Sequence, residues 1–148
     1  MNYKYNNTQR VIEEREYLGR WIKNYSMDNY GKDWNYCLGL SYRKYVVSDR
    51  MCNKNINELY LKLSNIDIDI DGFCVNEFEK NGIGIHHHLI IKSDLELKDF
   101  KNSIEKLWNN KGISHIMEYD GSKDYVFYMV KHVGKTNRNT WNNFKMCE

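Results

Sequence analysis

The sequence predicts an α+β fold, with an antiparallel sheet built on a split β-α-β-β-α-β core, one helix before this core and one after it. Two observations lead to this prediction. Residues 73–91 alternate like two strands joined at Asn81-Gly82, the dipeptide best suited to the positive φ angles of a type I′ turn. Apolar residues at helical spacing flank this hairpin on both sides, each next to a further strand pattern. In such a sheet the first and third strands are central.

Length and composition suit a single domain over residues 1–148. We divide it into an N-terminal helical extension (1–33), a core (34–135) and a polar basic tail (136–148). The formal net charge is only +2, so an anionic partner must be held by a local patch. Twelve Tyr, four Trp and five Phe are available for packing or for stacking on bases.

Four cysteines are scattered without a C-x-x-C pair, which predicts neither a disulfide framework nor a zinc cluster. Cys37 and Cys74 lie in apolar strand patterns and are expected to be buried free thiols. No stretch approaches the roughly 20 apolar residues of a membrane span. We therefore expect a cytoplasmic protein in a reducing compartment, with no membrane partner.

The elements before the hairpin are expected in the order helix, strand, helix, strand. The first helix should run from Thr8 to about Tyr25, and the first strand over residues 34–47. A second helix should begin at Asn55. Isoleucines and aspartates alternate over residues 66–71, which indicates a strand with a solvated aspartate face.

The elements after the hairpin are expected in the order helix, strand, helix. Ser93 starts a third helix that stops before Gly112, and a short strand follows over residues 113–119. The last helix should run over residues 123–133, and its apolar stripe includes Val126, Met129 and Val133.

The turn sets the register of the hairpin. With Asn81-Gly82 as the two loop residues, Glu77 pairs with His86, and His88 lies two residues further on the same face. A carboxylate and two imidazoles within reach of one another form a divalent-metal site, so Glu77, His86 and His88 are the predicted ligands. The alternative is a histidine-rich surface strand.

His87 points to the opposite face in this register, with Phe78 and Ile85. It is therefore expected to pack inside the protein and to take no part in the metal site.

The last helix carries a second constellation. Tyr128 projects nearly opposite the apolar stripe, with Lys131 beside it and Tyr125 one turn earlier. A phenol can attack a phosphodiester and form a covalent phosphotyrosine, while a lysine offsets negative charge in the transition state. The alternative is an aromatic residue on a solvated helix face beside a lysine with its charge in water.

Three stretches now resemble the HUH endonucleases, in particular the rolling-circle replication initiators of small plasmids, phages and single-stranded DNA viruses. They are YCLGLSY (36–42), IHHHLI (85–90), which contains a His-x-His flanked by apolar residues, and the Tyr-x-x-Lys of Tyr128 to Lys131. Glu77, nine residues before His86, is where such initiators commonly place a third metal ligand.

The resemblance implies an enzyme that nicks single-stranded DNA at an origin. Tyr128 would become linked to the 5′-phosphate and leave a free 3′-OH, with Lys131 assisting. The reaction would need one divalent metal ion, Mn²⁺ or Mg²⁺, and no small-molecule cofactor is implied. Tyr125 could act as a second nucleophile that accepts the DNA 5′-phosphate, but only Tyr128 has a lysine three residues later, as the Tyr-x-x-Lys motif requires. A polymerase and a separate helicase are the implied partners, because the chain has no Walker motif. The host would be a prokaryotic or virus-infected cell.

Cations and aromatic residues near these motifs are candidates for holding DNA. The predicted DNA-binding residues are Tyr42, Arg43, Lys44, Lys80, Lys135 and Arg138, and Trp141 is a further candidate for base stacking.

Two other functions stay open. Single-tyrosine HUH transposases share the histidine pair but typically carry Gln four residues after the tyrosine, where this chain has His132. A non-catalytic nucleic-acid-binding module similar to RNA-recognition domains could use the same scaffold.

The last helix poses a packing problem. If Tyr128 faces the sheet, the apolar stripe opposite it must be covered by another element. We expect the N-terminal helix to pack there through Leu18, Trp21 and Ile22.

Overall fold

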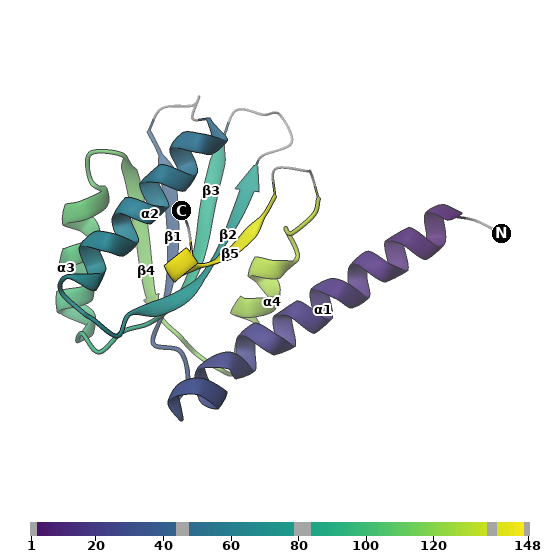
Figure 1. Cartoon of the computed structure of the whole chain (residues 1–148), viewed down its shortest axis with the longest axis horizontal. Helices are drawn as coiled ribbons and strands as arrows, with labels where there is room; N and C mark the ends of the chain where they lie inside the picture. Colours follow the sequence, from purple (N-terminus) through teal and green to yellow (C-terminus); the bar gives the residue numbers. More distant parts are fainter. Residues whose placement is uncertain (1–2, 44–47, 79–83, 136–138, 147–148) are drawn as a thin grey trace.

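Five antiparallel strands form an open sheet in the order β4-β1-β3-β2-β5 (Figure 1). This computed structural model describes residues 3–43, 48–78, 84–135 and 139–146, except for the side chains of 3–8 and 146. The strands are β1 (Tyr36–Tyr42), β2 (Asp71–Phe78), β3 (Ile85–Lys92), β4 (Gly112–Glu118) and β5 (Trp141–Asn143). The helices are α1 (Tyr3–Tyr30), α2 (Asp49–Ser64), α3 (Leu97–Trp108), α4 (Tyr125–Val130) and the short 3₁₀ helix η1 (Phe144–Met146).

The predicted α+β class is confirmed, and β1 and β3 are central as expected. The hairpin register is confirmed as well: Glu77 pairs with His86, and Phe78 pairs with Ile85. The turn at Asn81-Gly82 lies outside the described residues. The sheet therefore presents Glu77 and His88 on one face and His87 on the other.

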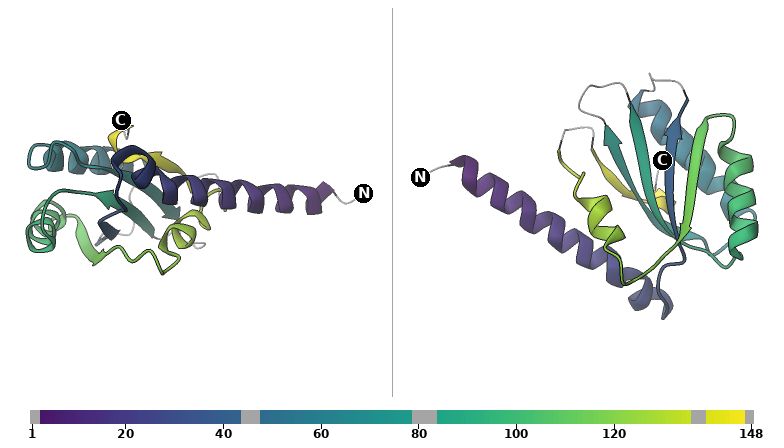
Figure 2. Two further views of the ribbon diagram at one scale, coloured as in Figure 1. Left: turned by 90° about the horizontal axis from the view of Figure 1, so that it is seen from below. Right: turned by 180° about the vertical axis from the view of Figure 1, so that it is seen from behind.

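Each face of the sheet carries its own hydrophobic cluster. On one face α2 and α3 pack against β1 and β3, and Figure 1 shows α2 crossing this face. On the other face α4 and α1 pack against β2 and β3, and the view from behind in Figure 2 shows α4 beside these strands. The candidate site lies on this second face.

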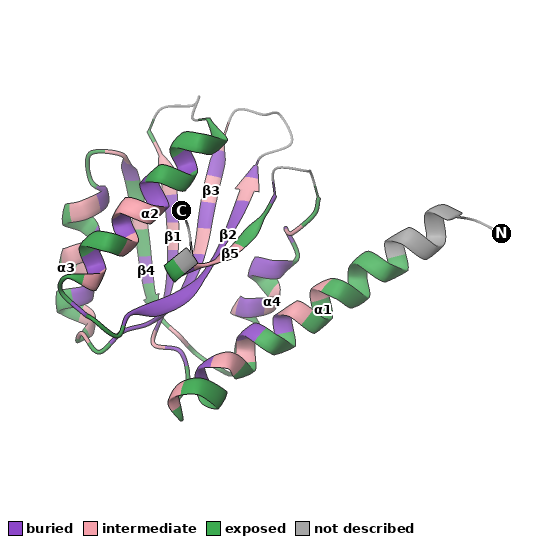
Figure 3. Ribbon diagram, viewed as in Figure 1, coloured by how far each residue is buried: buried purple, intermediate pink, exposed green. Residues whose placement is uncertain are grey.

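The N-terminal helix covers α4, as expected. Leu18 and Ile22 belong to the same cluster as Val126 and Met129 of α4. Gly19 permits the close approach, since a Cβ at this position would lie 2.7 Å from the ring of Phe127. The outer half of α1 extends away from the sheet, and residues 9–17 are exposed except for the half-buried Arg15 (Figures 1 and 3).

Trp21 of α1 packs elsewhere than expected. Its ring makes edge contacts with Phe73, at 5.2 Å between centroids, and with Trp141, at 6.0 Å. The indole remains partly exposed, so it contributes less to the cover of α4 than Leu18 and Ile22 do.

Two of the three aspartates expected on a solvated strand face, Asp67 and Asp71, are buried acceptors instead, while Asp69 is exposed as expected. The strand expected over residues 66–71 begins only at Asp71, and the preceding residues form turns. Asp67 accepts a hydrogen bond from Ser93 Oγ at 2.7 Å, and Asp71 accepts one from Tyr30. Buried carboxylates persist where donors of this kind satisfy them. Asp71 thereby ties the end of α1 to the sheet.

The second helix starts earlier than expected, at Asp49 and not at Asn55. Ser48 is its N-cap, and the Ser48 hydroxyl accepts the Met51 N–H at 3.2 Å. Asn55 lies inside the helix and is buried.

Other element ends differ from the expected ones. The first helix is longer than Thr8 to Tyr25 and ends before Gly31, whose φ is 68° and whose N–H bonds the Met27 carbonyl. β1 is shorter than the strand expected over residues 34–47, of which residues 44–47 lie outside the described residues. α4 covers only part of 123–133 and continues as a turn.

Part of the stretch expected as a polar tail is folded. β5 pairs with β2, with Trp141 opposite Val75, and Phe144 of η1 is fully buried. Cys37, Cys52 and Cys74 form no disulfide and are buried, as expected for Cys37 and Cys74. Among the helices that the structure describes, none has the length and apolar character needed to span a bilayer.

Replacing Ile22 by Ala tests the docking of α1. Ile22 is fully buried against α4, so we expect the free energy of unfolding to fall by about 2–5 kcal/mol in urea titrations. Ile12→Ala is the matched control on the exposed outer half of the same helix, where we expect a change within about 0.5 kcal/mol. Equal effects of the two substitutions would contradict this packing.

Candidate metal and tyrosine site

Three side chains on the second face of the sheet could hold a metal ion: Glu77, His88 and His132. One ligand atom from each lies within 4.8 Å of the other two. Glu77 Oε2 lies 2.7 Å from His88 Nε2, and Glu77 Oε1 lies 3.2 Å from His132 Nδ1. The two imidazole rings stack with 5.4 Å between their centroids. The carboxylate therefore joins two histidines from distant parts of the chain.

His132 is the member that the sequence interpretation left without a role. It follows α4, in a turn where its N–H bonds the Met129 carbonyl at 3.3 Å. Asn139 fixes the same turn, because its side-chain amide donates to the His132 carbonyl at 2.9 Å. The available signal was its position four residues after Tyr128, which puts both side chains on one side of a helical turn.

The protonation state of His132 suits a metal ligand. Burial lowers the pKa of His132 to about 4, although the negative charge of the Glu77 carboxylate acts to raise this pKa. The imidazole is therefore neutral at pH 7, which is the form that binds metal ions.

The hydrogen bonding of His132 is incomplete. Both ring nitrogens are buried, and neither has a hydrogen-bond partner among the described residues. The 3.2 Å approach of Nδ1 to Glu77 lacks hydrogen-bond geometry. Buried polar groups without partners are costly, and a cation shared with Glu77 and His88 would satisfy one of the two ring nitrogens of His132. The residues present thus fit a divalent ion.

Glu77 is kept ionised in this setting. Its burial raises the pKa of the carboxyl, but the hydrogen bond with His88 and the nearby imidazoles outweigh burial and leave the pKa below its usual range. A carboxylate that stays charged is the form that binds a cation.

His86, the other predicted ligand, is the cross-strand partner of Glu77 and lies on the same face of the sheet. It is not part of the three-residue group. Of the predicted ligands, the structure brings Glu77 and His88 together and adds His132 from another element.

His87 lies on the opposite face, away from this group, as expected. It is fully buried, its Nδ1 donates to Asn76 Oδ1 at 2.6 Å, and its Nε2 accepts from the Tyr42 hydroxyl at 2.7 Å. Burial lowers the pKa of His87 to about 3, so the ring is neutral. This network holds β3 to β1 and β2 directly behind the candidate site.

Tyr128 lies against the two imidazoles. Its ring meets His88 edge to face at 5.6 Å between centroids and His132 at 5.5 Å. Lys131 Nζ lies over the Tyr128 ring, 4.2 Å from its centroid. Nearly half of the Tyr128 surface remains exposed, and Lys131 is exposed too. A phenol and an ammonium group thus border the carboxylate–imidazole group on its solvent side.

Tyr125 is differently placed. Its hydroxyl donates to the carbonyls of Leu38 and Leu89, both at 3.3 Å. Burial raises its pKa above the ordinary value for a tyrosine. These contacts hold α4 to the sheet and leave Tyr128 as the accessible phenol of the pair.

The structure describes three of the six predicted DNA-binding residues, and none of these three belongs to the ligand group. Arg43 is exposed at the end of β1, and Lys135 is exposed beyond α4. Tyr42 is half-buried, with its ring against Trp108 and its hydroxyl on His87, so it does not offer a free surface for stacking. Three positions lie outside the described residues: Lys44, Lys80 and Arg138.

This arrangement combines the donor set of a divalent-metal site with an accessible phenol and a nearby cation. Comparison with known proteins adds no assignment: no family model matches the chain, and neither the curated proteins nor the solved structures give a match.

Proposed function

We propose that this chain is a metal-dependent endonuclease and strand transferase of the HUH type, which nicks single-stranded DNA at a replication origin through a 5′-phosphotyrosine. The observation that carries the proposal is the contact of the exposed Tyr128 with both His88 and His132, the two imidazoles that share Glu77. A phenol beside a divalent-metal donor set, with a lysine next to it, has the composition required for attack on a phosphodiester.

Glu77, His88 and His132 would hold one divalent cation. The bound ion would polarise the scissile phosphate and neutralise developing charge. Two imidazoles and one carboxylate favour Mn²⁺ over Mg²⁺, because Mg²⁺ prefers oxygen ligands.

The remaining steps belong to the chain itself. The Tyr128 hydroxyl loses its proton to solvent as its oxygen forms a bond to phosphorus, the bond from phosphorus to the 3′ oxygen breaks, and that oxygen takes up a proton from solvent and leaves as a 3′-OH. Lys131 offsets the negative charge on the phosphate. Reversal of the same exchange rejoins the strand. A polymerase would extend the 3′-OH, and a separate helicase would unwind the duplex in the cytoplasm of the host.

A transposase of the single-tyrosine HUH type is the second candidate. Its typical Gln four residues after the tyrosine is replaced here by His132, but the same position does contribute a side chain to the ligand group. Glu77 on the hairpin favours the initiator. DNA products in which two ends of a mobile element are joined, without nicking of an origin, would favour the transposase.

The nucleophile is tested by incubating the protein with single-stranded DNA and Mn²⁺. We expect a covalent protein–DNA adduct on a denaturing gel, lost with EDTA and lost in Tyr128→Phe. Tyr125→Phe is the matched control, since its hydroxyl bonds two main-chain carbonyls, and this variant should still form the adduct. No adduct with the wild type, or an undiminished adduct in Tyr128→Phe, would contradict the proposal.

The ligand set is tested by isothermal titration of the protein with Mn²⁺. We expect His132→Asn to weaken Mn²⁺ binding by at least about 100-fold, because loss of groups that merely support ligands already costs 10–100-fold. His115→Asn, an exposed histidine on β4, is the control and should bind like the wild type. Normal binding by His132→Asn would remove this residue from the ligand set.

A further inference from the structure

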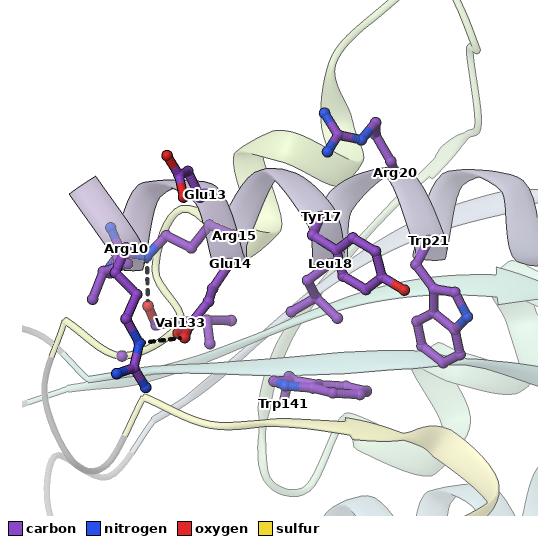
Figure 4. Close-up of a pocket in the computed structure, with 12 residues that line it drawn as sticks. Arg10, Glu13, Glu14, Arg15, Tyr17, Leu18, Arg20, Trp21, Val133 and Trp141 are labelled. Atoms are coloured by element: carbon purple, nitrogen blue, oxygen red, sulfur yellow. Dashed lines mark hydrogen bonds and ion pairs between the residues drawn. The ribbon is translucent and has the colours of Figure 1, made fainter. Parts of the chain in front are cut away.

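A groove of about 920 Å³ runs along α1 where this helix passes over the edge of the sheet (Figure 4). Its walls are the side of α1 from Arg10 to Trp21, the turn after α4 at Val133 and Gly134, and Trp141 of β5. These residues do not belong to the ligand group. The groove is therefore a concave surface distinct from the ligand group.

Aromatic rings line this groove and remain open to solvent. Tyr17 is 68% exposed, Trp21 is 42% exposed and Trp141 is 37% exposed. In Figure 4 the Trp141 ring lies flat beneath α1, with Tyr17, Leu18 and Trp21 on the helix side of the space. Open aromatic faces in a groove suit the stacking of nucleobases, which every base permits.

The charges around the aromatic rings favour an anion. Arg15 is fixed at the groove, because its Nε donates to the Val133 carbonyl at 2.7 Å. The other nitrogens of its guanidinium have no hydrogen bond to the described residues and can donate to a phosphate.

The acidic residues of the groove do not cancel this cation. Glu14 is paired with Arg10 at 2.9 Å, and Glu13 accepts a hydrogen bond from Gln9 at 3.2 Å. The lining holds three arginines and two glutamates, so its net charge is positive. The next residue beyond the groove wall at Gly134 is the exposed Lys135.

The groove starts beside the candidate site. His132 belongs to the ligand group, and the next two residues, Val133 and Gly134, line the groove. Consecutive Cα atoms are about 3.8 Å apart, so the groove wall at Val133 begins one residue from the ligand group.

We propose that this groove binds single-stranded DNA flanking the cleaved phosphodiester, with bases stacked on Trp141 and Tyr17 and a backbone phosphate held by Arg15. The proposal rests on the proposed nuclease function and gives α1 a direct role in it. It also explains why α1 is longer than the cover of α4 requires: the outer half of the helix forms one wall of the DNA groove.

The test measures DNA binding without cleavage. The full-length protein is titrated into a fluorescein-labelled oligothymidylate in EDTA, and the anisotropy gives Kd. We expect Trp141→Ala and Tyr17→Ala each to raise Kd about tenfold, the scale of one lost base stack. Trp141→Phe keeps a ring and should retain most of the binding. Arg15→Gln should raise Kd and reduce the salt dependence by about one phosphate contact.

Arg50→Gln is the matched control for charge, since Arg50 is an exposed residue of α2 outside the groove, and its Kd should equal that of the wild type. The thermal unfolding midpoint identifies any variant that fails to fold. The exposed Tyr17 keeps the test decisive, because it can be truncated without opening the core.

Equal Kd values for the wild type, Trp141→Ala, Tyr17→Ala and Arg15→Gln would overturn the groove assignment. Adduct formation at Tyr128 would then leave the nuclease proposal intact. A wild type that neither binds the oligothymidylate nor forms the adduct would overturn both. If sedimentation shows a dimer that Trp141→Ala dissociates while DNA binding is unchanged, a second copy of the chain occupies the groove, and the DNA assignment is wrong.

Discussion

The antiparallel pairing of β2 with β3 determines the geometry of the candidate site. Because side chains alternate across a strand, the register that places Glu77 opposite His86 also puts His88 on the same face and His87 on the other. A slip of one residue would bury His86 and His88 and expose His87. The buried hydrogen bonds of His87 to Asn76 and Tyr42 oppose such a slip. The packing of His87 on one face therefore fixes which residues lie on the face of the candidate site.

Helix α4 brings the remaining groups to this face, and α1 holds it there. Val126 and Met129 pack toward β2, β3 and α1, while Tyr128 and His132 turn toward His88. α4 is too short to be stable alone, so its position depends on these contacts. Asp71 binds the tyrosines at the end of α1 and anchors the helix that covers α4. Residues far from the site thus contribute to its alignment.

The parts of this structure that follow from local rules could be predicted from the sequence. The hairpin register needed only the turn and the two-residue period, and the central position of β3 needed only the order of elements. His132 could not be identified in this way, because a turn after α4 carries it to Glu77 through tertiary packing. The burial of Asp67 and Asp71 was equally hidden, since their donors come from other elements. The start of α2 was misplaced because several residues in this stretch could serve as a cap.

The central claim is that Glu77, His88 and His132 share a divalent ion beside Tyr128. Crystals of the protein grown with Mn²⁺ and measured for anomalous scattering test it most directly. The account predicts one strong anomalous peak in contact with these three side chains, on the side of the sheet that carries Tyr128. A peak held by other residues, or no peak at this group in crystals that bind Mn²⁺ elsewhere, would contradict it.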